Sequence, residues 1–163
     1  MIFLTVGTHE QQFNRLIKCI DELVREGVIK EEVIMQIGYS TYEPKYCKWF
    51  SLIPYADMET YISKARLIIT HGGPATFIMP LQKGKIPIVV PRQYEFNEHV
   101  NDHQLEFVKI ISKRMKNIIP VYDIKDMENI VKNYSKTVGS MKLNGCNNNI
   151  NFNNKLSEII NSM

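Results

Sequence analysis

Short apolar runs alternate along the chain with segments whose apolar residues recur every three or four positions. The longer-period segments predict helices over residues 13–24, 57–64, 74–83, 100–112 and 124–134. The short runs have the length and composition of strands and lie at residues 2–6, 33–37, 49–53, 67–70, 86–90 and 118–121. Because these runs are apolar on both faces, the alternation predicts an α/β domain whose parallel sheet is covered by helices.

The composition changes near the C-terminus. Seven of the eleven residues from 144 to 154 are asparagine, which is typical of a linker. Beyond them, one face of a short helix would carry Phe152, Leu156, Ile159, Ile160 and Met163. We therefore expect a domain over 1–143, an Asn-rich linker over 144–151 and an amphipathic helix over 152–163. That helix either caps its own domain or docks on a partner.

The bulk composition narrows the class of protein. The chain has 163 residues, of which 44% are hydrophobic and 23% charged, as in a soluble domain with one core. A net charge of +3 is too small to indicate nucleic acid, but it suits a site for an anionic ligand. The three cysteines are far apart and form no CxxC, which favours reduced thiols in the cytoplasm.

Two further features concern membranes and export. No apolar run approaches the roughly 20 residues that a bilayer-spanning helix needs. No basic segment precedes the run at 2–6, so the N-terminus is expected to be a strand rather than a signal peptide.

A His-Gly-Gly-Pro sequence joins the run at 67–70 to the following helix. Proline suits the first helical position, because its missing N–H would have no partner there. The remaining free N–H groups and the helix dipole can hold an anion, most often phosphate, and glycines allow a ligand to approach the backbone closely. An ordinary strand-to-helix turn would have the same features. The candidate phosphate-binding residues are His71, Gly72, Gly73, Pro74, Ala75 and Thr76.

All four histidines lie in segments that follow predicted strands. These segments are 7–10, 54–58, 71–73 and 91–104, and the histidines are His9, His71, His99 and His103. In an open parallel sheet such loops gather at the carboxyl edge, where ligands bind.

Three kinds of chemistry could use these loops. His99 and His103 could share a helix face as zinc ligands, but HExxH and a nearby cysteine are absent. A nucleophile is not indicated, because neither GxSxG nor a cysteine lies in the loops. The third possibility is a sugar nucleotide. Its phosphates would contact backbone N–H groups and Arg92. Its hydroxyl groups would contact the Glu, Asp, His and Gln side chains of these loops. A polar helix start would also account for residues 98–104.

Five motifs, in this order and spacing, resemble the C-terminal, donor-binding half of GT-B glycosyltransferases of family 28. The resemblance covers residues 1–134, and the motifs lie at 6–8, 55–58, 70–76, 87–92 and 98–104. It implies a single Rossmann-like domain. The most similar members are small subunits of split transferases. They comprise the catalytic subunit of the dolichol-pathway N-acetylglucosaminyltransferase and bacterial capsule or exopolysaccharide galactosyltransferase subunits, with the bacterial group more similar.

The resemblance also assigns roles to residues. Tyr55 and Met58 would lie against uracil, and the turn at 72–76 would hold the diphosphate. The donor sugar would contact Asp102, His103 and Gln104, and the donor site would also include Gly7, Thr8 and His99. Many relatives bind ribose with a glutamate where this chain has Pro80, which cannot accept a hydrogen bond through its side chain and is expected to distort its helix. Either Glu98 replaces that glutamate or the ribose is held loosely.

The function that the resemblance implies is an inverting, UDP-dependent hexosyltransferase. This chain would be its catalytic, donor-binding subunit and would transfer a hexose, with galactose expected, to a lipid-linked saccharide in capsule or exopolysaccharide biosynthesis. The acceptor half is absent, so a membrane-anchored partner would supply it and hold the chain at the inner face of the cell membrane. His9, or a group on the partner, would be the base.

No cofactor or metal is expected, because Arg92 and the helix start would stabilise the leaving UDP. The alternative is a non-catalytic regulatory or scaffold subunit that stabilises a separate transferase, and Pro80 favours that alternative.

Overall fold

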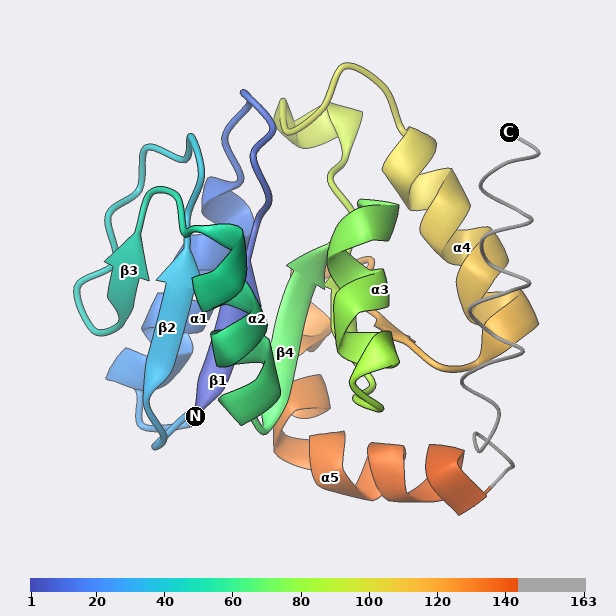
Figure 1. Cartoon of the computed structure of the whole chain (residues 1–163). Helices are drawn as coiled ribbons and strands as arrows, with labels where there is room; N and C mark the ends of the chain where they lie inside the picture. The colour runs from blue at the N-terminus through green and yellow to red at the C-terminus, as the bar shows by residue number, and fades with distance from the viewer. Residues whose placement is uncertain (144–163) are drawn as a thin grey trace.

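Six parallel strands form one sheet within residues 1–143, which are the residues that the computed structural model describes. The order is β3-β2-β1-β4-β5-β6, so the chain builds outward from β1 on one side and then returns beside β1 to build the other (Figure 1). The strands are β1 (Ile2–Thr5), β2 (Val33–Gln36), β3 (Lys48–Phe50), β4 (Leu67–His71), β5 (Ile88–Val90) and β6 (Ile119–Pro120). This order confirms the predicted Rossmann-like sheet and reverses direction between β1 and β4. The expected linker at 144–151 and helix at 152–163 lie outside the described residues.

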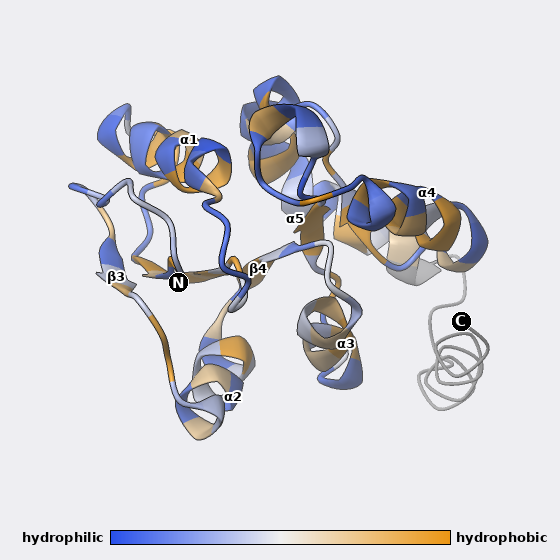
Figure 2. Cartoon of the chain, turned by 90° about the horizontal axis from the view of Figure 1, so that it is seen from above, coloured by the Kyte–Doolittle hydropathy of each residue, from blue (hydrophilic) through white to orange (hydrophobic). Residues whose placement is uncertain are grey.

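Helices cover both faces of this sheet. They are α1 (Asn14–Arg25), α2 (Tyr55–Lys64), α3 (Pro74–Gln82), α4 (His103–Met115) and α5 (Met127–Leu143). Figure 2 shows α1 and α5 on one side of the sheet and α2 and α3 on the other. The buried clusters agree, and they place α4 with α3, because Val108 and Ile111 of α4 pack with Phe77 of α3. None of the helices described is long and apolar enough to cross a bilayer.

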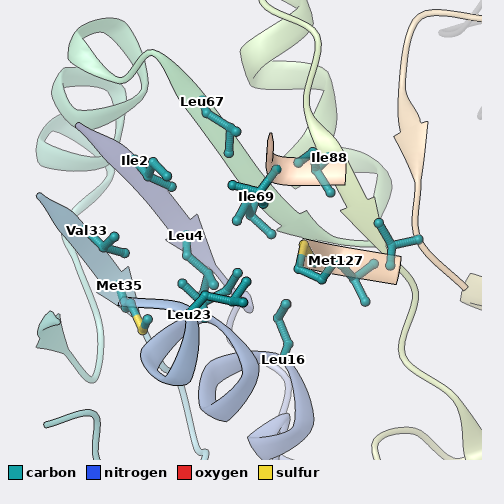
Figure 3. Packing of buried hydrophobic residues seen from close by; sticks show 14 of the residues in the cluster. Ile2, Leu4, Leu16, Leu23, Val33, Met35, Leu67, Ile69, Ile88 and Met127 are labelled. Atoms are coloured by element: carbon teal, nitrogen blue, oxygen red, sulfur yellow. The ribbon is translucent and has the colours of Figure 1, made fainter. Parts of the chain in front are cut away.

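The core follows from the alternation of side chains along each strand. Ile2 and Leu4 point toward α1 and α5, while Phe3 between them packs against Ile62 of α2 on the opposite face. The larger cluster joins the sheet to Leu16 and Leu23 of α1 and to Met127 of α5 (Figure 3). Burial on both faces explains why the strands are continuous apolar runs rather than alternating ones.

Two predicted helix starts are displaced. Helix α2 begins at Tyr55, two residues early, because the Pro54 carbonyl already accepts a hydrogen bond from the Met58 amide. Helix α4 begins at His103, three residues later than predicted. The segment before it forms a separate loop, in which Asn97 has a left-handed conformation (φ 54°) and the Tyr94 amide donates to the Asp102 carboxylate.

Helix α3 agrees with its predicted range of 74–83 to within one residue, whereas helix α5 differs from the expectation at both ends. Helix α3 continues through Pro80 to Gln82, and the Lys83 amide closes its end on the carbonyls of Met79 and Pro80. Proline therefore removes one hydrogen bond from α3 without ending it. A 3₁₀ turn over Ile124–Asp126 precedes α5, which runs nine residues beyond the predicted end at 134 to Leu143.

Candidate functional site

A cavity of about 720 Å³ opens at the carboxyl edge of the sheet, beside the point where the strand order reverses. In open α/β sheets this crevice is where ligands bind. The ends of β1, β2 and β4 supply its floor, and α2, α3 and α4 supply its walls. The lining residues are Thr5, Gly7, Thr8, His9, Glu10, Gln36, Met58, His71, Gly73, Pro74, Ala75, Thr76 and Gln104.

The imidazole of His71 occupies the turn between β4 and α3. Its Nδ1 accepts a hydrogen bond from the Gly73 amide at 3.0 Å, and its Nε2 lies 2.9 Å from the hydroxyl oxygen of Thr76. The residue is only 8% exposed. Burial, assisted by the positive charge of Arg92, lowers the pKa of His71 to about 4, so the ring is neutral near pH 7.

Two glycines of the cavity make room for this ring. A Cβ atom on Gly73 would lie 2.2 Å from Cε1 of His71, and a Cβ atom on Gly7 would lie 2.4 Å from its Nε2. Gly7 also has a φ of +75°, which side chains disfavour. The sequence explanation for Gly73, close approach of a phosphate, is therefore incomplete, because the histidine ring already requires glycine at this position.

Gly72 is a predicted site residue that does not line the cavity. A Cβ atom there would lie 3.0 Å from Cγ2 of Val108 and 3.1 Å from Cα of Pro91. The absence of a side chain at Gly72 thus allows the turn to pack closely against α4 and against the residue that follows β5.

Arg92 does not line the cavity, contrary to its predicted role at phosphate. Its side chain is fully buried and donates to four main-chain oxygens, those of Val6, Gln11, Gln12 and Glu98, at 2.9 to 3.1 Å. Its guanidinium also lies 4.8 Å from the centre of the Phe13 ring. Because the donors face carbonyls of two loops, Arg92 connects the loop after β1 to the loop after β5 instead of facing a ligand.

Glu98 is likewise buried, contrary to its suggested role at ribose. Both carboxylate oxygens bind Arg15, one to Nε at 2.9 Å and the other to Nη2 at 2.8 Å, and the carboxylate also accepts from the Gln93 amide. The Glu98 side chain is 0% exposed and that of Arg15 13%. This bidentate pair fixes the loop before α4 to helix α1.

His9, which lines the cavity, stacks on His99, which does not. The rings of His9 and His99 are 4.6 Å apart and within 12° of parallel. Nε2 of His9 lies 3.0 Å from Oε1 of Gln11, which can only accept, so Nε2 is the donor in this contact. Burial, followed by the positive potentials of His9 and Arg92, lowers the pKa of His99.

The structure therefore brings together ten of the seventeen predicted site residues. Those in the cavity are Gly7, Thr8, His9, Met58, His71, Gly73, Pro74, Ala75, Thr76 and Gln104. Those outside it are Tyr55, Gly72, Arg92, Glu98, His99, Asp102 and His103. Tyr55 is 66% exposed on α2, and Asp102 and His103 are exposed before and at the start of α4.

Three lining residues were not predicted: Thr5, Glu10 and Gln36. Thr5 and Gln36 are paired residues at the ends of β1 and β2, and a polar residue closing an apolar strand run is a signal for them. The zinc site that His99 and His103 could have formed needs further ligands. No three His, Cys, Asp or Glu side chains converge within residues 1–143.

The fold and the cavity define a Rossmann-like domain with a ligand crevice at its topological switch point. Residues 1–161 match the glycosyltransferase family 28 C-terminal domain, and the chain belongs to this family. The fold corresponds to the C-terminal half of a GT-B glycosyltransferase. A solved glycosyltransferase of kitacinnamycin superposes over 92% of this chain and 38% of its own, with a TM-score of 0.61 and 16% identity.

A human relative adds a second comparison. The UDP-N-acetylglucosamine transferase subunit ALG13 of Homo sapiens is 36% identical over an alignment of 122 residues that covers 69% of this chain. The aligned part is 10% of the human protein, so this chain spans only a small part of its relative's length.

Proposed function

We propose that this chain is the donor-binding, catalytic subunit of a two-component glycosyltransferase that uses a UDP-sugar. The observation that carries the proposal is the cavity between β1 and β4, whose lining includes the first residues of α3. The chain that holds this cavity belongs to family 28. The positive end of the α3 dipole favours an anionic group there, and the diphosphate of a UDP-sugar is such a group.

Other residues of the cavity suit the sugar and the base of the UDP-sugar. Gln104 uses its Oε1 to accept from the Arg92 amide at 3.2 Å, which leaves its amide N–H groups for a sugar hydroxyl. Met58 offers an apolar surface from α2 for the base. The lining contains no lysine or arginine within the described residues. Dipoles and hydroxyl groups of this chain, with any groups that a partner adds, would therefore stabilise the leaving UDP.

His9 is the proposed base. In the neutral ring Nδ1 carries the lone pair, because Nε2–H is then the group that donates to Gln11, and the loop of His9 lines the cavity. In a single inverting displacement, Nδ1 would remove the proton of the acceptor hydroxyl as that oxygen attacks the anomeric carbon. UDP would leave from the opposite face of the sugar.

The proposed donor hexose is galactose, and the proposed acceptor is a lipid-linked saccharide. The resemblance to bacterial subunits favours galactose, whereas the human relative is a subunit of a UDP-N-acetylglucosamine transferase. The acceptor would be a lipid-linked saccharide of capsule or exopolysaccharide synthesis. A membrane-anchored partner would bind it and hold this chain at the inner face of the membrane.

Isothermal titration of the purified chain with UDP, UDP-galactose and UDP-N-acetylglucosamine tests the proposal. Binding of UDP, with tighter binding of one UDP-sugar, is expected. Thr76→Val should weaken this binding, whereas Thr60→Val, an exposed change on α2, should not. Absence of binding by both the chain and its complex with the partner would instead favour a scaffold subunit.

A further inference from the structure

The start of α3 offers fewer free donors than its sequence suggests. The Gly73 amide is bonded to His71, Pro74 has no N–H, and the Thr76 amide donates to the Gly73 carbonyl at 3.1 Å. The Ala75 amide alone among these has no acceptor within the described residues. A diphosphate at the first turn of α3 would thus meet the Ala75 amide, and the side chain of Thr76 is the neighbouring group that could supply a further donor.

The hydrogen bonds of His71 determine its tautomer. Nδ1 accepts from the Gly73 amide, so it carries a lone pair and the proton of the neutral ring is on Nε2. Nε2–H then donates to the Thr76 hydroxyl oxygen at 2.9 Å. Oε1 of Gln104 lies 3.5 Å from Nδ1 and accepts from the Arg92 amide, so it supplies no proton to the ring.

The hydrogen bond from His71 restricts the direction in which the Thr76 hydroxyl can donate. Because its oxygen accepts from His71, its own hydrogen points away from the ring, and it has no acceptor among the residues described. Thr76 lines the cavity beside Ala75 on the first turn of α3. The hydroxyl is therefore prepared to donate into the cavity.

We propose that His71 is a positioning residue that makes the Thr76 hydroxyl a donor to the diphosphate of the UDP-sugar, next to the Ala75 amide. The proposal rests on the proposed function. His71 itself makes no contact with the ligand, and it acts by fixing the Gly73 turn through Nδ1 and the Thr76 rotor through Nε2. A cationic ring would lose the Gly73 hydrogen bond, because both of its nitrogens would then donate.

Substitutions that mimic one nitrogen at a time test this role. In His71→Asn the amide oxygen replaces Nδ1 and the donor to Thr76 is lost, whereas His71→Gln can place an N–H near the Nε2 position. We expect Thr76→Val to weaken UDP binding roughly 10-fold or more, as for a lost hydrogen bond to a charged group. His71→Asn should cause a similar loss, and both Thr76→Ser and His71→Gln a smaller one.

The double variant separates positioning from direct contact. If His71 acts through Thr76, adding His71→Asn to Thr76→Val causes little further loss of UDP affinity. Losses that multiply would mean that His71 binds the ligand itself and would overturn the proposal, as would unchanged affinity in Thr76→Val. Circular dichroism of each variant confirms that the fold is retained.

A measurement without ligand completes the test. Long-range ¹H–¹⁵N spectra of the free, full-length chain distinguish the two tautomers of His71, and the Nε2–H form is expected at neutral pH. The Nδ1–H form, in a chain that binds UDP, would overturn the positioning role alone. Wild-type protein that shows the Nε2–H form but fails to bind UDP, alone and with its partner, would overturn the proposed function and the role of Thr76 with it.

Discussion

The guanidinium of Arg92 donates to the main-chain oxygen of Glu98 at 3.1 Å, while the carboxylate of Glu98 is bound by Arg15. Opposite charges six residues apart thus do not pair with each other. Each is used to fix a loop, Arg92 against the loop after β1 and Glu98 against helix α1. The loop after β1, which lines the cavity, is therefore joined to the loop after β5 by a buried charged group.

Glu98→Ala should destabilise the protein rather than remove a ligand contact. The change leaves Arg15 without its partner, and breaking a largely buried ion pair typically costs roughly 3 kcal/mol or more. Urea unfolding measures this loss, and Glu95→Ala, in the exposed part of the same loop, is the control. Unchanged stability together with lost UDP affinity would instead return Glu98 to the ligand site.

Gly73→Ala should disturb the cavity through His71, and Gly73→Val should abolish UDP-sugar binding while the fold persists. The added Cβ would lie 2.2 Å from the His71 ring, which must move and release Thr76. Gly139→Ala, in open space on α5, should leave both binding and stability intact. Calorimetry and circular dichroism compare the variants, and full affinity in Gly73→Ala would show that the His71 ring is not fixed as described.

Gln104→Ala should lower turnover, and affinity for the UDP-sugar, more than affinity for UDP alone. UDP lacks the sugar hydroxyl that the Gln104 amide is proposed to contact. Gln104→Glu retains an acceptor for the Arg92 amide and separates that structural hydrogen bond from the sugar contact. Equal losses for UDP and UDP-sugar in calorimetry would place Gln104 away from the sugar.

His9→Ala should lower the maximal rate of the complex with its partner by roughly 100-fold or more, with donor binding largely kept. The proposed base is lost, whereas the groups of α3 that would hold the diphosphate remain. Lys113→Ala, an exposed change on α4 outside the cavity, is the control. Retention of the rate in His9→Ala would assign the base to Glu10 or to the partner.

The stability of the protein should fall as the pH is lowered from about 6.5 to about 4 because of His71. The unfolded chain binds a proton near the ordinary pKa of histidine, while the folded chain resists protonation until about pH 4. His71 thus contributes stability above that interval and loses it within the interval, by up to about 3 kcal/mol at about 1.4 kcal/mol per unit. Urea unfolding of wild type and His71→Gln should give curves that converge toward low pH, and parallel curves would contradict the assignment.

The sequence by itself determined the alternation of strands and helices, because burial on both faces of a parallel sheet leaves apolar runs that local reading can find. It also located the turn at His71 and Gly73, since proline at the first position of α3 marks a helix start. The family motifs could be found in the same way, because they lie at the ends of the predicted strands or in the segments that follow them. Most cavity residues near this turn were accordingly predicted.

Only the tertiary structure decided which polar side chains face the cavity. Arg92 reaches the Gln11 carbonyl across 81 positions of sequence, and Arg15 reaches Glu98 across 83. A buried charged group must find hydrogen-bond partners, and those partners come from whichever loops the fold brings beside it. Local sequence marks Arg92 and Glu98 as polar loop residues suited to a ligand. Long-range packing instead pairs the Nη atoms of Arg92 with main-chain oxygens and Glu98 with Arg15, and it leaves the cavity to the groups around His71.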